Sequence, residues 1–252
     1  RSTPEQKGML PLGEKPREKT QAASSVPTGA TVPAYDVAPR PGMTQAQAYR
    51  TPAFWLLGAA LIFSGISVNG MISNLKPLLS ALDAEVEIVA FILASMGLFV
   101  MLGKFLTGVL FDKTKLIIAV GIVSLANAAQ FFFMLSPHSV FNASFFAFLH
   151  GFGATMVTVT PAYLAARLFG ERDYSAVYAS VSVFAMLGAA VAAPFGVLFY
   201  GTPETSTSAH ASTLVWAWLI MGLIGFVLFA VTVMIKPKLP DAEPVVSETV
   251  AN

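Results

Sequence analysis

A single lysine, Lys104, lies inside an otherwise uncharged apolar run over residues 88–111. A lone cation in hydrocarbon is costly, so such a residue is typical of a binding or transport site. Gly97 and Gly108 would share its helical face, at i−7 and i+4, and would leave room beside the ammonium. We therefore interpret Lys104 as the ligand of an anion. The alternative is that its stem reaches the nearer headgroups, because the run ends roughly 10 Å further along a helix.

A short charged turn, Asp112, Lys113 and Lys115, follows this run directly. Basic residues next to a membrane-spanning segment mark its cytoplasmic end. On that assignment the opposite connections hold only one basic residue, Lys76. The cytoplasmic side holds seven: Arg50, Lys113, Lys115, Arg167, Arg172, Lys236 and Lys238. The asymmetry predicts that both ends of the helical region face the cytoplasm, and we expect the cell membrane as its location.

Four further polar side chains lie inside apolar runs and are candidates to line a solute path: Asn69, Asn74, His150 and Tyr163. An imidazole titrates near neutral pH, so His150 is a candidate proton carrier. The equal alternative is a hydrogen-bonded histidine of the core. The two amides and the phenol would bind solute on one interpretation and join helices through hydrogen bonds on the other.

Six apolar runs must position these residues. They extend over residues 53–75, 88–111, 116–135, 140–166, 174–203 and 211–235. Each is long enough to cross ~30 Å of hydrocarbon as a helix that rises 1.5 Å per residue. The sequence therefore predicts an all-α membrane protein, with a bundle of six transmembrane helices over residues 51–236.

The overall composition agrees with a lipid bilayer as the surroundings. The chain has 252 residues, of which 55% are hydrophobic and 12% charged, whereas roughly a quarter of the residues of a soluble domain are charged. The net charge of +1 gives no reason to expect a nucleic-acid partner. There is no cysteine, which excludes disulfides and thiolate metal sites. Since no catalytic or complete phosphate-binding motif is present, we expect neither an enzyme nor a metal site or cofactor.

Residues 1–50 have a different composition, with seven prolines and many serines, threonines and glutamines. Such a segment buries too little apolar surface to offset its ordering entropy, so it predicts a disordered cytoplasmic linker. Residues 237–252 are expected to form a cytoplasmic tail. The chain begins at Arg1 and shows no targeting segment there, which leads us to expect a piece of a longer chain.

Two predicted helices contain helix-breaking residues at matching places, if the six helices divide into two sets of three. The residues are Ser64, Gly65, Asn69, Gly70 and Pro77 in the first, and Gly151, Gly153 and Pro161 in the fourth. Such breaks indicate the central path of a transporter built from repeats. The alternative is close helix packing through small residues, which we favour for the fifth helix with its Gly188, Pro194 and Gly196. No internal sequence repeat is evident.

Residues 108–115 resemble the loop signature of the major facilitator superfamily: a glycine, three residues, an aspartate and then basic residues. The segment departs from that pattern at Lys115, where a glycine is usual. The superfamily fold has twelve helices in two six-helix halves, joined by a long cytoplasmic loop. The resemblance implies that this chain is that loop and the C-terminal half, with the N-terminal six-helix half as its partner. It also implies that Asp112 engages a neighbouring helix end and stabilises one access state; the alternative is a plain topological charge cluster.

Within the superfamily, four segments are similar to the oxalate:formate antiporter and monocarboxylate transporter group: residues 51–57, 71–79, 103–108 and 167–178. In that group a cation on the eighth helix binds the substrate carboxylate, and Lys104 is its counterpart here. The resemblance implies transport of a small carboxylate by alternating access, coupled to protons or to a counter-anion. The oxalate antiporter also uses a lysine on its eleventh helix. Because residues 174–203 contain no basic residue, a monocarboxylate is favoured over a dicarboxylate.

Two other functions stay open. The chain would fit an exporter of another solute, such as a drug or a sugar, in which Lys104 belongs to a structural ion pair. It would also fit a receptor-like or assembly subunit that has this fold and transports nothing.

Overall fold

The computed structural model describes residues 41–200, 207–237 and 239. Residues 1–40 of the predicted linker and nearly all of the predicted tail lie outside the described residues. The described part is helical, and its strand pairing is limited to one isolated bridge between Gly42 and Gly170.

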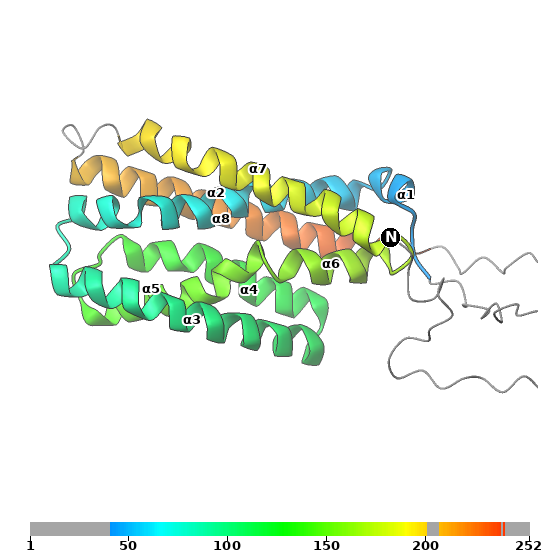
Figure 1. The fold of residues 1–252 in the computed structure, drawn as a ribbon, viewed down its shortest axis with the longest axis horizontal. Helices are drawn as coiled ribbons and strands as arrows, with labels where there is room; N and C mark the ends of the chain where they lie inside the picture. The colour runs from blue at the N-terminus through cyan, green and yellow to red at the C-terminus, as the bar shows by residue number, and fades with distance from the viewer. Residues whose placement is uncertain (1–40, 201–206, 238, 240–252) are drawn as a thin grey trace, which may run out of the picture. The chain divides into compact units, whose positions relative to one another are not determined.

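Six long helical segments follow one another along the chain (Figure 1). They are α2 (Pro52–Ala81), α3 (Val86–Lys113), α4 (Leu116–Met134), α5 (Val140–Gly153) with η2 (Ala154–Met156) and α6 (Thr160–Phe169), α7 (Tyr174–Tyr200) and α8 (Ser208–Ile235). By length and composition, five helices can each cross a membrane, and the bent pair made of α5–η2 and α6 brings the number to six. The predicted all-α membrane class is confirmed, and the predicted runs match these segments closely.

Local sequence explains where several of these helices begin. Thr51 caps α2, because its side chain accepts a hydrogen bond from the Phe54 amide and Pro52 occupies the first turn. Ser139 caps α5 through the Asn142 amide in the same way. Each cap satisfies an amide that has no partner inside the helix.

The two spans predicted to be interrupted behave differently. The first, α2, is one helix through Gly65, Gly70 and Pro77, so the predicted break there is wrong. Its amide side chains turn back onto their own helix: Asn69 Nδ2 donates to the Gly65 carbonyl at 3.0 Å and Asn74 Nδ2 to the Gly70 carbonyl at 2.8 Å. The fourth span is broken after α5 and bends by 40° before α6, as its glycines and proline predict.

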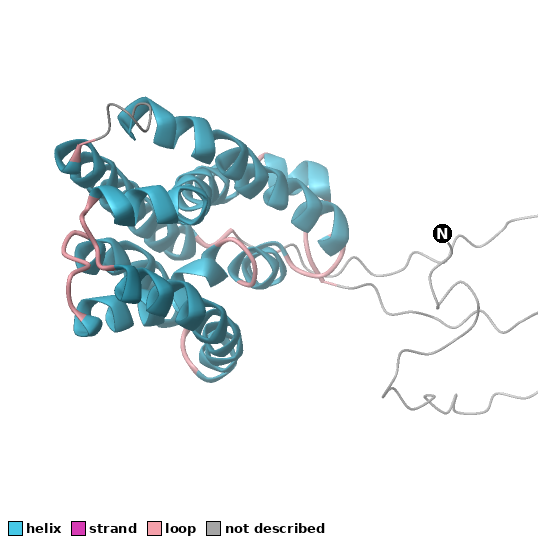
Figure 2. Ribbon diagram, turned by 60° about the vertical axis from the view of Figure 1, so that its left-hand side comes forward, coloured by secondary structure: helices cyan, strands magenta, loops and turns pink. Residues whose placement is uncertain are grey.

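The helices pack as two groups of three (Figures 1 and 2). In one group α2 packs against α7 and α8, and in the other α5 packs against α3 and α4. The groups meet mainly along α4 and α8. If α2, α3 and α4 are exchanged in order with the bent span, α7 and α8, the same pairs of helices pack together. This is the packing expected of two structural repeats.

Two helix crossings with glycines at the contact are related by the same exchange of spans. On α2 and α7, a Cβ at Gly65 would lie 2.7 Å from the Ala185 carbonyl oxygen, and a Cβ at Gly188 would collide with the Ile62 carbonyl. On α5 and α3, a Cβ at Gly103 would collide with the Gly151 carbonyl. The glycines therefore let each pair of backbones approach closely, the packing role predicted for Gly188.

The helices α3 and α7, which correspond in the two sets of spans, also share a short sequence pattern. Residues 94–103 and 179–188, which lie 85 positions apart, carry the same residue at six of ten positions: Ala, Ser, Phe, Met, Leu and Gly. The glycine that ends each copy is the one at the helix crossing. The bundle therefore contains an internal repeat in both packing and sequence.

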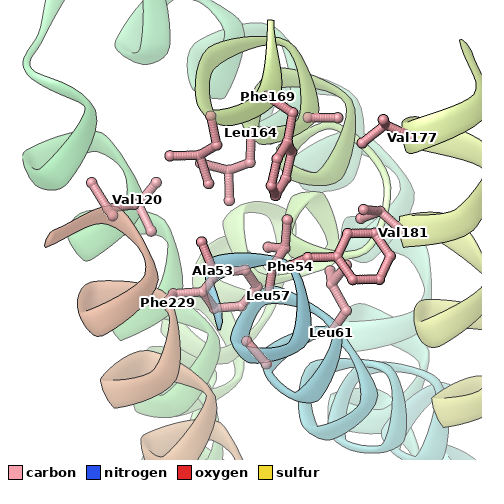
Figure 3. Close-up of a cluster of buried hydrophobic side chains, with 14 of the residues drawn as sticks. Ala53, Phe54, Leu57, Leu61, Val120, Leu164, Phe169, Val177, Val181 and Phe229 are labelled. Atoms are coloured by element: carbon pink, nitrogen blue, oxygen red, sulfur yellow. The ribbon is translucent and has the colours of Figure 1, made fainter. Parts of the chain in front are cut away.

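The larger buried cluster joins all six spans near the start of α2 (Figure 3). Phe54 of α2 is almost fully buried and lies with its ring edge against Phe169 of α6 and Phe184 of α7. Burial of large side chains like these supplies most of the packing energy inside a bundle. This cluster fixes the ends of α2, α6 and α7 relative to one another.

Residues 41–50 fall within the predicted disordered linker, yet they dock onto the corner between α6 and α7. The Met43 amide donates to the Phe169 carbonyl at 2.7 Å and the Glu171 amide to the Pro41 carbonyl at 3.0 Å. The short helix α1 (Gln45–Tyr49) then holds Ser180 of α7 through the Gln45 side chain at 2.9 Å. Residues 41–50 are therefore ordered against the bundle, in contrast to the prediction for this part of the segment.

Candidate functional site

Lys104 projects from α3, which is the least buried of the spans. Its side chain is exposed, and within the described part of the chain it has no ion-pair or hydrogen-bond partner. A Cβ placed at Gly97 or Gly108 meets no atom within 4 Å, so both glycines leave open space on the same face. Met101, one turn before Lys104, is 64% exposed on that face. The ammonium is thus accessible on a face that this bundle does not cover.

The repeat gives Lys104 a counterpart on α7, the second least buried span. Adding 85 to 104 gives Ala189, and adding 85 to 101 gives Met186, which is 69% exposed like its twin. The helix α7 contains no basic residue. Of the two faces related by the repeat, only the face on α3 therefore carries a cation, Lys104.

Asn69 and Asn74 lie on α2 and are half-buried. Both amide groups donate to carbonyls of their own helix, as described above. Asn74 also contacts α7, since a Cβ at Gly196 would collide with its side-chain nitrogen. These contacts fit the interhelical packing alternative, and none of them brings either residue to Lys104.

His150 lies inside the bundle rather than on the open face. Its side chain is fully buried, and Nδ1 is 2.8 Å from Gln130 Oε1 on α4. Gln130 Nε2 donates to both the backbone carbonyl and the side-chain Oδ1 of Asn127, each at 2.9 Å. Asn127 Nδ2 in turn donates to Ser67 Oγ of α2 at 3.4 Å. The result is a buried polar chain that joins α5, α4 and α2.

The far end of the His150 ring has no partner. Nε2 is buried and makes no hydrogen bond within the described residues. The ring stacks on Phe146 of its own helix, with centroids 6.1 Å apart. A polar atom buried without a partner is rare in native structures and indicates a functional demand or a bound molecule.

Tyr163 lies with the charged loop, not with Lys104. Its hydroxyl donates to the Phe111 carbonyl at 2.7 Å and accepts from Arg167 Nη2 at 2.8 Å. The Tyr163 and Phe111 rings also stack, with centroids 4.5 Å apart. The structure therefore places Tyr163 at the end of α3, where it holds α6 against the loop.

The loop residues themselves are exposed. Asp112, Lys113 and Lys115 form no ion pair within the described part of the chain. The end of α3 is held instead by Thr114, whose Oγ1 donates to the Leu110 carbonyl at 2.7 Å. This arrangement leaves the charged groups free to meet a partner outside the bundle.

One relation links the open face to the buried chain. Gly103 and Gly151 touch at the crossing of α3 and α5, and their sequence neighbours are Lys104 and His150. One turn further on, Thr107 Oγ1 lies 3.3 Å from Thr155 Oγ1, and both side chains are buried. Lys104 and His150 thus flank the same crossing, one pointing outward and one inward. Sequence reasoning missed the crossing because a glycine pair 48 residues apart carries no local signal.

Comparison with known proteins places the chain in a family. A family model described as the Major Facilitator Superfamily matches residues 11–193 and residues 55–251. A search of curated proteins found none that matches the chain.

Proposed function

Because the chain belongs to the major facilitator superfamily, and so serves the membrane transport of a solute, we propose that this solute is a small carboxylate bound at Lys104. One observation carries the proposal. Lys104 is a cation at membrane depth that is exposed, has no anionic partner in the described part of the chain and stands on a face kept open by two glycines. A buried or membrane-embedded ammonium requires a counter-ion, and a substrate carboxylate supplies one.

The number of cations favours a monocarboxylate. A dicarboxylate would be best held by two positive charges, and the repeat offers Ala189 where a second one would stand. Lysine presents a compact point charge instead of the planar fork of arginine, so it sets charge more strongly than orientation. A single carboxylate group with a small, variable remainder fits such a ligand.

The open faces of α3 and α7 fit a second six-helix bundle. We place this chain as the C-terminal half of a twelve-helix transporter, with Lys104 facing the cavity between the halves. Alternating access would then move one half against the other around the bound carboxylate. The exposed Asp112, Lys113 and Lys115 are placed to engage that second half in one of the two states.

Counterflow in vesicles tests the function. The complete protein is reconstituted, the vesicles are loaded with unlabelled carboxylate, and entry of radiolabelled lactate, pyruvate, formate or oxalate is measured. We expect a monocarboxylate to exchange faster than oxalate, and the matching amide, lactamide, not to compete. Competition by neutral sugars or hydrophobic cations in place of carboxylates would support an exporter instead. A folded protein that moves none of these solutes would contradict transport by this site.

A further inference from the structure

We propose that His150 Nε2 takes up the proton that is carried with the carboxylate, which makes the transporter a proton symporter. The inference rests on the proposed function, since it names the coupling ion of that cycle. Three observations carry it: a hydrogen-bond chain that fixes the tautomer of His150, a buried acceptor left without a partner, and a helix break beside the ring.

The hydrogen-bond chain fixes which ring nitrogen of His150 carries hydrogen. Gln130 Nε2 lies 2.9 Å from the Asn127 backbone carbonyl, which can only accept, so this atom must be the amide donor. Gln130 Oε1 therefore faces His150, and Nδ1 must donate to it across 2.8 Å. A neutral imidazole that carries hydrogen on Nδ1 has its lone pair on Nε2.

The chain continues in one direction to a backbone group. Asn127 Nδ2 donates to Ser67 Oγ at 3.4 Å, and Ser67 Oγ donates to the Ser64 carbonyl at 3.1 Å. Each donor atom of this chain already makes a hydrogen bond, so turning any of them toward Nε2 would break an existing bond. The structure thus holds a proton acceptor in the interior and keeps it vacant.

The backbone beside His150 is irregular. The helix α5 ends at Gly153, is followed by η2 and resumes as α6 after a 40° bend. Irregular backbone at membrane depth occurs where it is buried in protein or lines a water-filled cavity. Gly153, where α5 passes into η2, lies against the polar chain, since a Cβ there would lie 2.9 Å from Gln130 Nε2. We expect movement of this segment to give the ring access to water.

No other titratable group of the described helices competes for this role. The helix α4 and the turn η2, which pack against α5, contain no titratable residue, and α2 contains only Lys76, which is exposed near the end of that helix. The titratable residues of α3 are Glu87, Lys104, Asp112 and Lys113, all exposed and none bonded to His150. Among the described residues, His150 is the only titratable side chain that is buried.

Charge balance explains why proton and carboxylate would move together. The empty site carries the single positive charge of Lys104. Loading a carboxylate and a proton adds one negative and one positive charge, so the loaded site carries the same net charge. Loading the proton alone would place two positive charges in a low-dielectric region, whereas a carboxylate neutralises Lys104, so uptake of the proton is favoured once the carboxylate is bound. In the step itself, hydronium on one side gives a proton to the Nε2 lone pair and becomes water. The imidazolium returns the proton to water on the other side as hydronium, while Nδ1–H stays bonded to Gln130.

Two measurements on reconstituted vesicles of the complete protein test this. The first follows the wild type: pyranine trapped inside reports proton entry while a labelled monocarboxylate enters. The second compares His150→Gln with the wild type in counterflow and in uptake driven by an inward proton gradient. We expect the carboxylate to carry protons inward in the wild type, and His150→Gln to lose gradient-driven accumulation while counterflow persists. Ser124→Ala, which removes a buried hydroxyl of α4 bonded only within its own helix, is the control and should keep both activities.

The outcomes separate this inference from the proposed function. If no carboxylate moves in counterflow, the proposed function fails. If carboxylate exchanges in the wild type without proton entry, only the proton site is overturned, and this reading does not depend on how any variant folds. Gradient-driven uptake that survives in His150→Gln would also overturn the proton site. Equal loss of counterflow and gradient-driven uptake in this variant would overturn it too, because that result is expected of a histidine with a structural role only.

Discussion

At Tyr163 one hydroxyl joins the end of α3 to α6, through the Phe111 carbonyl and Arg167. Tyr163→Phe keeps the ring stacking and removes both hydrogen bonds. We expect the free energy of unfolding to fall by about 1 kcal/mol, because a half-buried carbonyl loses its partner. The substrate KM in counterflow should stay unchanged, because the hydroxyl is used at the loop. Thermal unfolding and counterflow measure the two effects.

The opposite pattern for Tyr163→Phe, a raised KM with unchanged unfolding temperature, would show that this residue lines the solute path, as its sequence context suggests.

The structure separates such candidates in a way that the sequence does not. Lys104 stands out by charge alone. The hydrogen bond between Gln130 and His150, by contrast, depends on the rotation of two helices about their axes, which no spacing along one helix fixes.

At the scale of elements, the crossing of α3 and α5 depends on Gly103. A Cβ there would collide with the Gly151 carbonyl, and backbone cannot move aside as a side chain can. We expect Gly103→Ala to lower the unfolding temperature by several degrees, because the two helices must separate and the buried Thr107–Thr155 contact opens. Thermal unfolding of the purified protein measures this.

Gly97→Ala, on the same helix, is the matched control for stability. Its Cβ meets nothing within 4 Å, and alanine is the better helix former by about 1 kcal/mol, so the variant should be as stable as the wild type or more so. Equal losses in the two variants would show that the crossing has no special role and that helix flexibility dominates.

The spans themselves were predictable because their cause is local: uncharged runs long enough for a bilayer, with caps such as Thr51 at the start of α2. What was not predictable has non-local causes. Pro77 was expected to help interrupt α2, but packing keeps the helix continuous. Residues 41–50 have the composition of a linker, and they are ordered because Phe169 and Glu171, far along the chain, supply backbone partners.

At the scale of the whole molecule, the predicted topology places the two ends of the bent span on opposite sides of the membrane. His138 precedes α5 and Glu171 follows α6, and both are exposed. This chain has no cysteine, so it adds no thiol that competes with a single introduced one. We expect His138→Cys to react with an impermeant maleimide in intact cells and Glu171→Cys to react only after permeabilisation.

Labelling of both positions from one side would show that α5, η2 and α6 form a re-entrant loop instead of a span. Labelling with the sides reversed would contradict the orientation inferred from the basic connections. The expected result would also support the structural repeat. If the two sets of three spans are related, the bent span must cross the membrane as its counterpart α2 does.

Removing the charge of Lys104 tests whether this residue binds the carboxylate. We would measure the KM of a labelled monocarboxylate in counterflow for the wild type, Lys104→Met and Lys104→Arg, with Lys76→Met, an exposed lysine on α2, as the control. Methionine keeps the length of the stem and removes the charge. We expect Lys104→Met to lose saturable uptake or to raise KM strongly, Lys104→Arg to retain binding, and Lys76→Met to resemble the wild type. An unchanged KM in folded Lys104→Met would contradict a carboxylate site at this residue.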